Sequence, residues 1–215
     1  MKTQEITLMK EDILSLGRAV SSAVAELGRL LGGDVNASFE TVEKLEADIN
    51  ARFFKIEERC MDLLTEHNDF TAKEVRTLVG STLIAAKFER LADHAHRVAK
   101  LAFWARQDNV MPPAELAEMA HLVQRMVDDT LVCYLTDAVE RVSELVQRDS
   151  HVNYLHDVVC KKLLSDLGVQ EQEEAQTRTQ FLFCARYLER MGDCITSIAR
   201  RTYFIVTGSR LKAEV

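Results

Sequence analysis

A five-residue motif, Glu-Arg-x-x-Asp, occurs twice in the chain at an offset of 100 residues. The two acidic residues of each copy are four positions apart, so they lie on the same face of a helix. Two carboxylates at this spacing repel each other unless a cation or a basic side chain lies between them. Such oxygen ligands suit Mg, Mn, Ca or Fe ions, and a neighbouring His extends the choice to Zn. The first copy contains Glu89 and Asp93, with His94 and His96 as candidate extra ligands, and the second contains Glu189 and Asp193.

Further oxygen ligands precede each motif by one predicted helix. Glu46 and Asn50 form such a stripe in the first half, and Asp149 and Asn153 form one in the second half. If each stripe packs beside its motif, each half gathers three or four oxygen ligands. The sequence therefore predicts two metal sites. The residue types leave the ion open among Fe, Zn, Mn and Mg.

An ion-pair network is the competing interpretation of the same residues. Arg90 and Arg190 lie inside the motifs, and Arg97 follows Asp93 by one helical turn. Exposed pairs of this kind contribute only about 0.3–0.5 kcal/mol each and are common on helices. Spacing alone favours this network. The recurrence of the motif in register favours a site, because a random charge pattern need not repeat.

Patterns typical of enzymes are missing from the sequence. It contains no nucleophile elbow and no Gly-rich phosphate loop. Glu118 and His121 have the spacing of carboxylate di-iron bundles, but there is no second Glu-x-x-His pair. We therefore expect a binding protein rather than an enzyme. A metal store or a carboxylate-bridged di-metal protein remains the alternative.

Six helices must position these residues. Apolar residues alternate steps of three and four in six segments, which predicts bundle helices near 6–30, 42–63, 72–106, 116–145, 152–163 and 181–205. The two Pro residues stand together near the midpoint, and the motif helices match across it. The predicted fold is all-α, with two similar antiparallel three-helix bundles at residues 1–109 and 110–215.

Composition narrows the function further. The formal net charge of −7 argues against nucleic-acid binding and against docking on anionic lipid. No segment approaches the roughly 20 apolar residues of a membrane span, and the first residues lack the apolar core of a signal peptide. The five Cys residues form no C-x-x-C pair and are expected to be reduced. We expect a cytoplasmic protein.

The doubled motif in a six-helix chain resembles the PhoU family of phosphate-transport regulators. The likeness extends from about Ile6 to Gly208 and is sharpest at residues 88–95 and 188–193. Glu74-Val75-Arg76 and the closing residues 203–208 are also similar to family elements.

The resemblance implies a cytoplasmic adaptor that is often dimeric. Family members connect the ATPase subunit of the phosphate ABC transporter to a phosphate-responsive sensor kinase, and they reach the membrane only through such protein partners. In ample phosphate they restrain both uptake and the starvation response. Some carry iron or zinc clusters on the carboxylate motifs, so Glu89, Asp93, Glu189 and Asp193 inherit a ligand role by position.

Three positions in the second motif depart from the family pattern. Cys194, Ser197 and Arg200 stand where His, Asn and an acidic residue are usual. Each change removes a ligand or adds positive charge. On sequence alone, the first motif is therefore the better candidate for a metal site.

Overall fold

The computed structural model describes residues 2–108, 110–165 and 172–211, without the side chains of residues 2, 3 and 172–174. Six α-helices are found in these ranges, and a short 3₁₀ helix, η1 (Val139–Arg141), precedes the fifth. The α-helices are α1 (Lys2–Leu31), α2 (Phe39–Glu66), α3 (Ala72–Gln107), α4 (Ala114–Thr136), α5 (Val142–Ser165) and α6 (Gln172–Thr207). The predicted all-α fold is confirmed.

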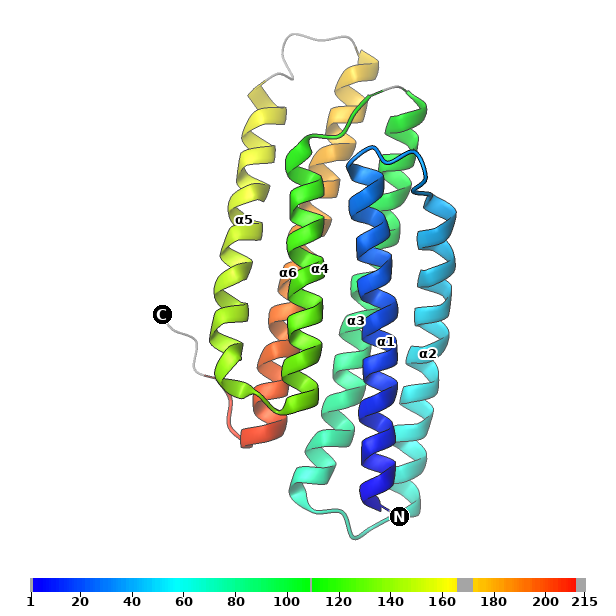
Figure 1. Cartoon of the computed structure of the whole chain (residues 1–215), viewed down its shortest axis with the longest axis vertical. Coiled ribbons are helices and arrows are strands. Elements are labelled where there is room, and N and C mark those ends of the chain that lie inside the picture. Colours follow the sequence, from blue (N-terminus) through cyan, green and yellow to red (C-terminus); the bar gives the residue numbers. More distant parts are fainter. Residues whose placement is uncertain (1, 109, 166–171, 212–215) are drawn as a thin grey trace.

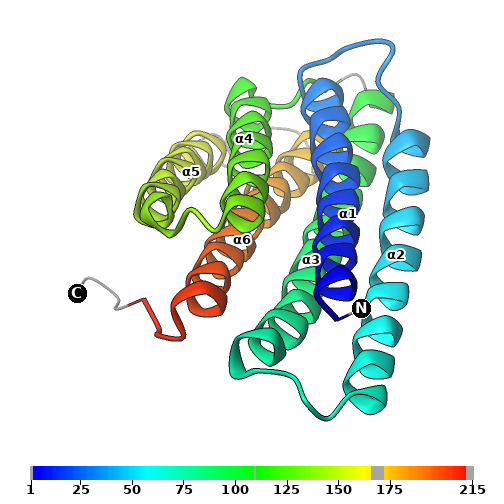
Figure 2. The same ribbon diagram turned by 60° about the horizontal axis from the view of Figure 1, so that its bottom comes forward.

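The two halves pack side by side as an elongated bundle (Figure 1). Helices α1 and α4 lie together in front of α3 and α6, while α2 and α5 flank the two sides (Figures 1 and 2). Each half is an antiparallel three-helix bundle, and α3 and α6 occupy ranges offset by 100 residues. The contact between α3 and α6 is the most extensive between any two helices. The two motif helices therefore lie at the junction of the halves.

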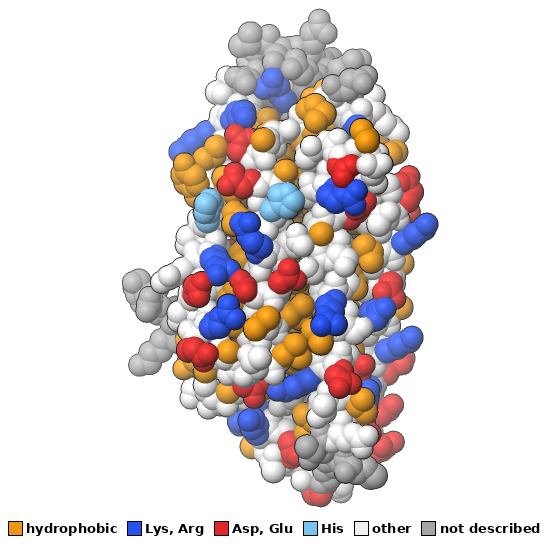
Figure 3. All heavy atoms as spheres, in the orientation of Figure 1, with side chains coloured by type: hydrophobic (Ala, Val, Ile, Leu, Met, Phe, Trp, Pro, Cys, Tyr) orange, Lys and Arg blue, Asp and Glu red, His pale blue; other side chains and the backbone are white. Residues whose placement is uncertain are grey.

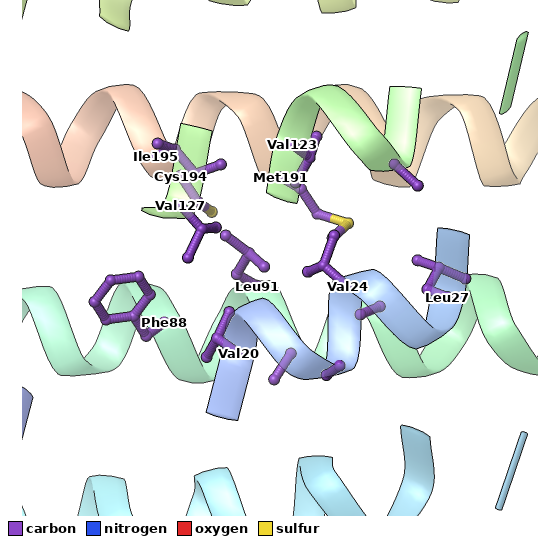
Figure 4. Close-up of a cluster of buried hydrophobic side chains, with 14 of the residues drawn as sticks. Val20, Val24, Leu27, Phe88, Leu91, Val123, Val127, Met191, Cys194 and Ile195 are labelled. Carbon is purple, nitrogen blue, oxygen red and sulfur yellow. The ribbon is translucent and has the colours of Figure 1, made fainter. Parts of the chain in front are cut away.

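A single large hydrophobic core joins the halves. Val20 and Val24 of α1 and Leu91 of α3 are fully buried against Met191 and Ile195 of α6 (Figure 4). These residues belong to the three-and-four spacing seen in the sequence. The division near residue 109 stays a prediction, since residue 109 lies outside the described ranges. No helix in those ranges has both the length and the apolarity to cross a bilayer.

Helix ends follow local sequence signals. Ser38 caps α2 by accepting a hydrogen bond from the Thr41 amide. Thr71 and Glu74 form a capping box at the start of α3. Gly33 and Gly208 follow α1 and α6 with φ angles of +80° and +72°, a backbone conformation that glycine adopts without strain.

The predicted boundary between the fourth and fifth helices is wrong. The apolar spacing predicts one helix to residue 145, whereas α4 ends at Thr136 and α5 begins at Val142. The chain turns at Asp137, whose φ of 54° is left-handed. Asp tolerates this conformation, and the Asp137 carboxylate accepts a hydrogen bond from Lys10 at 2.8 Å. Leu167 and Gly168, where we expect the fifth helix to close beyond its last apolar residue near 163, lie outside the described residues.

Candidate functional site

The first carboxylate cluster lies between α2 and α3 and consists of Glu46, Glu89 and Asp93. Partial burial raises the pKa of Glu89, and the charges of Asp93 and Glu46 raise it further, whereas Arg90 lowers it. Asp93 already has a basic partner, because both its oxygens accept from Arg97 Nε at 3.1 Å. The first cluster is therefore partly neutralised by the predicted ion pair.

The second carboxylate cluster lies between α5 and α6 and consists of Asp149, Glu189 and Asp193. Burial raises the pKa of Asp149 to about 6, and the charges of Asp193 and Glu189 add to this effect. A hydrogen bond from Asn153, 3.5 Å long, and the charge of Arg200 act in the opposite direction. These carboxylates therefore lie close enough to repel one another.

Two oxygen atoms without hydrogen-bond partners distinguish the second cluster from the first. Asp149 Oδ1 and Glu189 Oε2 are both buried and have no hydrogen-bond partner. The other Glu189 oxygen, Oε1, is 2.8 Å from Arg186 Nη1. Two buried acceptors without donors are costly for a metal-free protein. The sequence ranked the first motif higher, whereas the unpaired oxygens lie in the second.

A glycine in the second motif brings Asp149 close to α6. A Cβ atom at Gly192 would lie only 2.3 Å from Asp149 Oδ1, so no larger residue fits while this carboxylate keeps its place. The matching residue in the first motif is Ala92, and Glu46 takes the corresponding position on α2. The sequence analysis missed this role of Gly192. The sequence did contain a signal for this role. The first motif has Ala92 and Glu46, whereas the second has the smaller Gly192 and the shorter acid Asp149 at the equivalent positions.

The two candidate histidines point in different directions. His94 is 4% exposed, and its ring lies 5.4 Å from the Tyr187 ring of α6. Its Nδ1 is 4.0 Å from Asp93 Oδ2, which is beyond hydrogen-bond distance. His96 stacks on Phe39 at 5.2 Å, with its Nε2 3.9 Å from Glu43 Oε1. Neither ring is hydrogen-bonded to the first cluster.

The three departures in the second motif also have different surroundings. Cys194 lines a hollow shared with residues of α3, and Ser197 lines the hollow beside it. Both lie on the α3-facing side of α6, whereas Asp149 approaches α6 from α5. Arg200 alone acts on the second cluster, where its charge lowers the pKa of Asp149.

Metal binding requires several donor side chains to converge on one point. In the described part of the chain, no three His, Cys, Asp or Glu side chains converge closely enough to hold a metal ion. The second cluster still supplies hard oxygen donors, two of them unpaired and buried, which suit a cation of the Mg, Mn or Fe type. Asn50 and Asn153 lie on the neighbouring helices as predicted, with Asn50 half-buried and Asn153 exposed. The metal sites stay predictions.

The Glu118-x-x-His121 pair does not form half of a di-metal site. Glu118 Oε1 lies 3.9 Å from His151 Nε2 on α5. The His121 ring lies against α1, where a Cβ atom at Gly28 would be 3.1 Å from it. The two side chains therefore face different neighbouring helices.

Comparison with known proteins decides the family. A family model described as the PhoU domain matches residues 13–102 and again 116–202, one match in each half. The chain belongs to the PhoU family. The PhoU matches cover both carboxylate motifs.

Curated PhoU relatives align along nearly the whole chain. One from Clostridium acetobutylicum is 25% identical over 207 residues, which cover 94% of this chain and 93% of the relative. Another from Synechocystis is 28% identical over 209 residues, covering 96% and 92%. Both are called phosphate-specific transport system accessory protein PhoU homologs.

Solved PhoU structures share the fold. The crystal structure of PhoU from Pseudomonas aeruginosa has a TM-score of 0.89 at 21% identity, covering 97% of this chain and all of the other. The phosphate transport system regulatory protein PhoU from Streptococcus pneumoniae has a TM-score of 0.86 at 22% identity, covering 99% and 100%. The arrangement of the helices is thus that of PhoU.

Proposed function

We propose that this chain is a cytoplasmic accessory protein of phosphate transport that restrains uptake and the phosphate-starvation response when phosphate is plentiful. The match of the PhoU domain to both halves is the observation that carries this proposal. The names of the aligned relatives, which are phosphate-specific transport system accessory proteins, support it.

The proposed mode of action is binding rather than catalysis. The partners are the ATPase subunit of the phosphate ABC transporter and a phosphate-responsive sensor kinase, and the chain acts as a homodimer. A rigid helical surface that binds one state of a partner more tightly than another shifts the partner towards that state. Its effect is limited by this difference in affinity. The continuous core of the two halves supplies the rigidity.

Capture of the partners tests this role. The full chain, tagged and expressed at its native level, should retain the ATPase subunit and the sensor kinase from the native host. Cells that lack the chain should take up more radiolabelled phosphate in rich medium, and the wild-type gene should reverse this. If neither partner is retained and uptake is unchanged, the proposal is wrong.

We further propose that the second carboxylate cluster is the stronger of two metal sites. The unpaired, buried Asp149 Oδ1 and Glu189 Oε2 support this ranking. Asp193 would complete the donor set with Asn153 beside it, while Glu46, Glu89, Asp93 and Asn50 would form the weaker site. A cation held there would neutralise the repelling carboxylates of α5 and α6.

A further inference from the structure

A basic hollow lies between α3 and α6, with Asp193 of the second carboxylate cluster at its edge. It has a volume of about 360 Å³ and is lined by Lys87, Arg90, Arg186 and Arg190, with His94 and Asp193 beside them. The basic residues are exposed or half-buried, whereas the core-facing residues of both helices are buried. The hollow therefore opens to solvent on the outer side of the α3–α6 junction.

Most of this positive charge is not neutralised by the protein. Arg186 pairs with Glu189 at 2.8 Å. Lys87, Arg90 and Arg190 form no ion pair or hydrogen bond within the described part of the chain. These three cations face one carboxylate, Asp193, in a chain whose formal net charge is −7. Like charges gathered in a concavity repel one another and raise the local concentration of anions.

A buried donor lies in the wall of the same hollow. His94 is 4% exposed, and neither of its ring nitrogens has a hydrogen-bond partner. A neutral imidazole carries one N–H donor, which normally finds an acceptor when buried. The oxygen of an anion held by Arg90 and Arg190 is such an acceptor.

The pairing of the repeats places this hollow at their junction. Arg90 and Arg190 occupy the same position in the two motifs, as do His94 and Cys194. The two guanidinium groups thus reach the hollow from opposite helices. Guanidinium groups bind tetrahedral oxyanions through paired N–H donors, so two of them favour phosphate over a monovalent halide.

The face formed by α1 and α4 differs from this hollow in its mix of charges. On that face, acidic and basic side chains are interspersed with apolar ones (Figure 3). Arg18 of α1 and Arg125 of α4 are exposed and form no ion pair among the described residues, so they serve as charge-matched controls.

We propose that the hollow between α3 and α6 binds a phosphate-type oxyanion with at least two negative charges. The ligand is either free inorganic phosphate or the phosphoryl group of a phosphomonoester. The site differs from the carboxylate clusters in the sign of its charge. It needs no metal ion and does not depend on the proposed regulatory role.

Calorimetric titration of the full chain tests the proposal, with inorganic phosphate and O-phosphoserine as separate ligands. EDTA removes metal ions, and sodium chloride keeps the ionic strength constant. We expect at least one ligand to bind. The double variant Arg90→Gln/Arg190→Gln should weaken binding by about tenfold or more, since it removes both guanidinium groups that donate charge-assisted hydrogen bonds to the anion. Arg18→Gln/Arg125→Gln should change it by less than about twofold, since neither arginine lines the hollow and salt screens charges at a distance.

The pattern of binding identifies the ligand and tests the site. Binding of phosphate alone identifies the free ion as the ligand, whereas binding of phosphoserine alone identifies a phosphoryl group carried by a larger molecule. Absence of binding by both ligands at millimolar concentration overturns the proposal, as does an equal loss in the two double variants. Circular dichroism confirms folding, and the single variant Lys87→Gln provides a second test if the double variant unfolds.

Discussion

The two carboxylate clusters have the same motif on equivalent helices, yet their chemical states differ. In the first, Arg97 donates to both oxygens of Asp93, and the acid on the neighbouring helix is the longer Glu46. In the second, the shorter Asp149 lies against Gly192, and two buried oxygens have no partner. Duplication thus preserves the motif, whereas the residues around it determine whether its charge is neutralised within the protein or left open to a cation.

Removal of two acids from each cluster should give the largest contrast. We expect Asp149→Ala/Glu189→Ala to weaken binding of Mn, Fe or Zn by on the order of 100-fold, about 2.7 kcal/mol, because it deletes both unpaired oxygens. The matched variant Glu46→Ala/Glu89→Ala should weaken binding less than about tenfold. Metal analysis of the purified variants and competition titrations measure this. Equal losses would show that the clusters are equivalent.

Neutralising one acid of the second cluster should stabilise the metal-free protein. The pKa of Asp149 is raised from 3.8 to about 6, so the folded state retains a proton that the unfolded state has lost. The contribution of Asp149 to stability therefore falls as pH rises from about 4 to 6 and stays low above pH 6.

We expect Asp149→Asn in EDTA to gain about 1–2 kcal/mol at pH 8, less than the roughly 3 kcal/mol of the full shift because the carboxylate is partly exposed. That gain corresponds to about 3–6 °C in melting temperature and should vanish near pH 4. Glu89→Gln in the first cluster should show a smaller gain of the same sign, since burial and nearby acids also raise the pKa of Glu89. If Asp149→Asn destabilises the protein at pH 8, Asp149 is not repelled by the neighbouring carboxylates.

Filling the space at Gly192 should make the second cluster resemble the first. A Cβ atom there would be 2.3 Å from Asp149 Oδ1, so Gly192→Ala must displace this carboxylate. We expect metal affinity to fall by about tenfold, or 1.4 kcal/mol. The higher helix propensity of Ala, about 0.8–1.0 kcal/mol, should keep the variant folded. Unchanged affinity would mean that the position of Asp149 is unimportant.

Removing the internal cation of the first cluster should have the smallest effect. Arg97→Gln frees both oxygens of Asp93 at a cost of about 0.3–0.5 kcal/mol in stability, as for other exposed helical pairs. Metal binding at the first cluster should strengthen by a few fold, about 0.5–1 kcal/mol. Arg52→Gln, which breaks the Arg52–Asp48 pair of the same spacing, serves as the control. If the two variants bind metal equally, Arg97 does not limit the first cluster.

The fold could be predicted from the sequence because each helix carries its own signals. Ile13, Leu16 and Val20, which follow the three-and-four apolar spacing of the first helix, are fully buried, and Thr71 and Glu74 cap the start of α3. The turn at Asp137 was missed because the apolar spacing continues through it without Gly or Pro. Apolar spacing shows which face of a helix is buried. It does not show where one helix ends if the same spacing continues into the next.

The site was less predictable because it depends on contacts between helices. The sequence placed Glu89, Asp93, Glu189 and Asp193 on the correct helices, and the acids on α2 and α5 lie near them. It did not show that His94 lies beside Tyr187. Nor did it show that Cys194 and Ser197 line hollows shared with α3. These placements follow from the packing of α3 against α6, which periodicity alone does not specify.

A phosphate-starvation reporter, read in rich phosphate in the native host, tests the central claim most directly. Strains with the wild-type gene, without the gene, and with the gene restored are compared. We expect a silent reporter with the gene, an active reporter without it, and a silent reporter again on restoration. A reporter that stays silent without the gene, with phosphate uptake unchanged, would contradict the proposed role of this chain as a negative regulator.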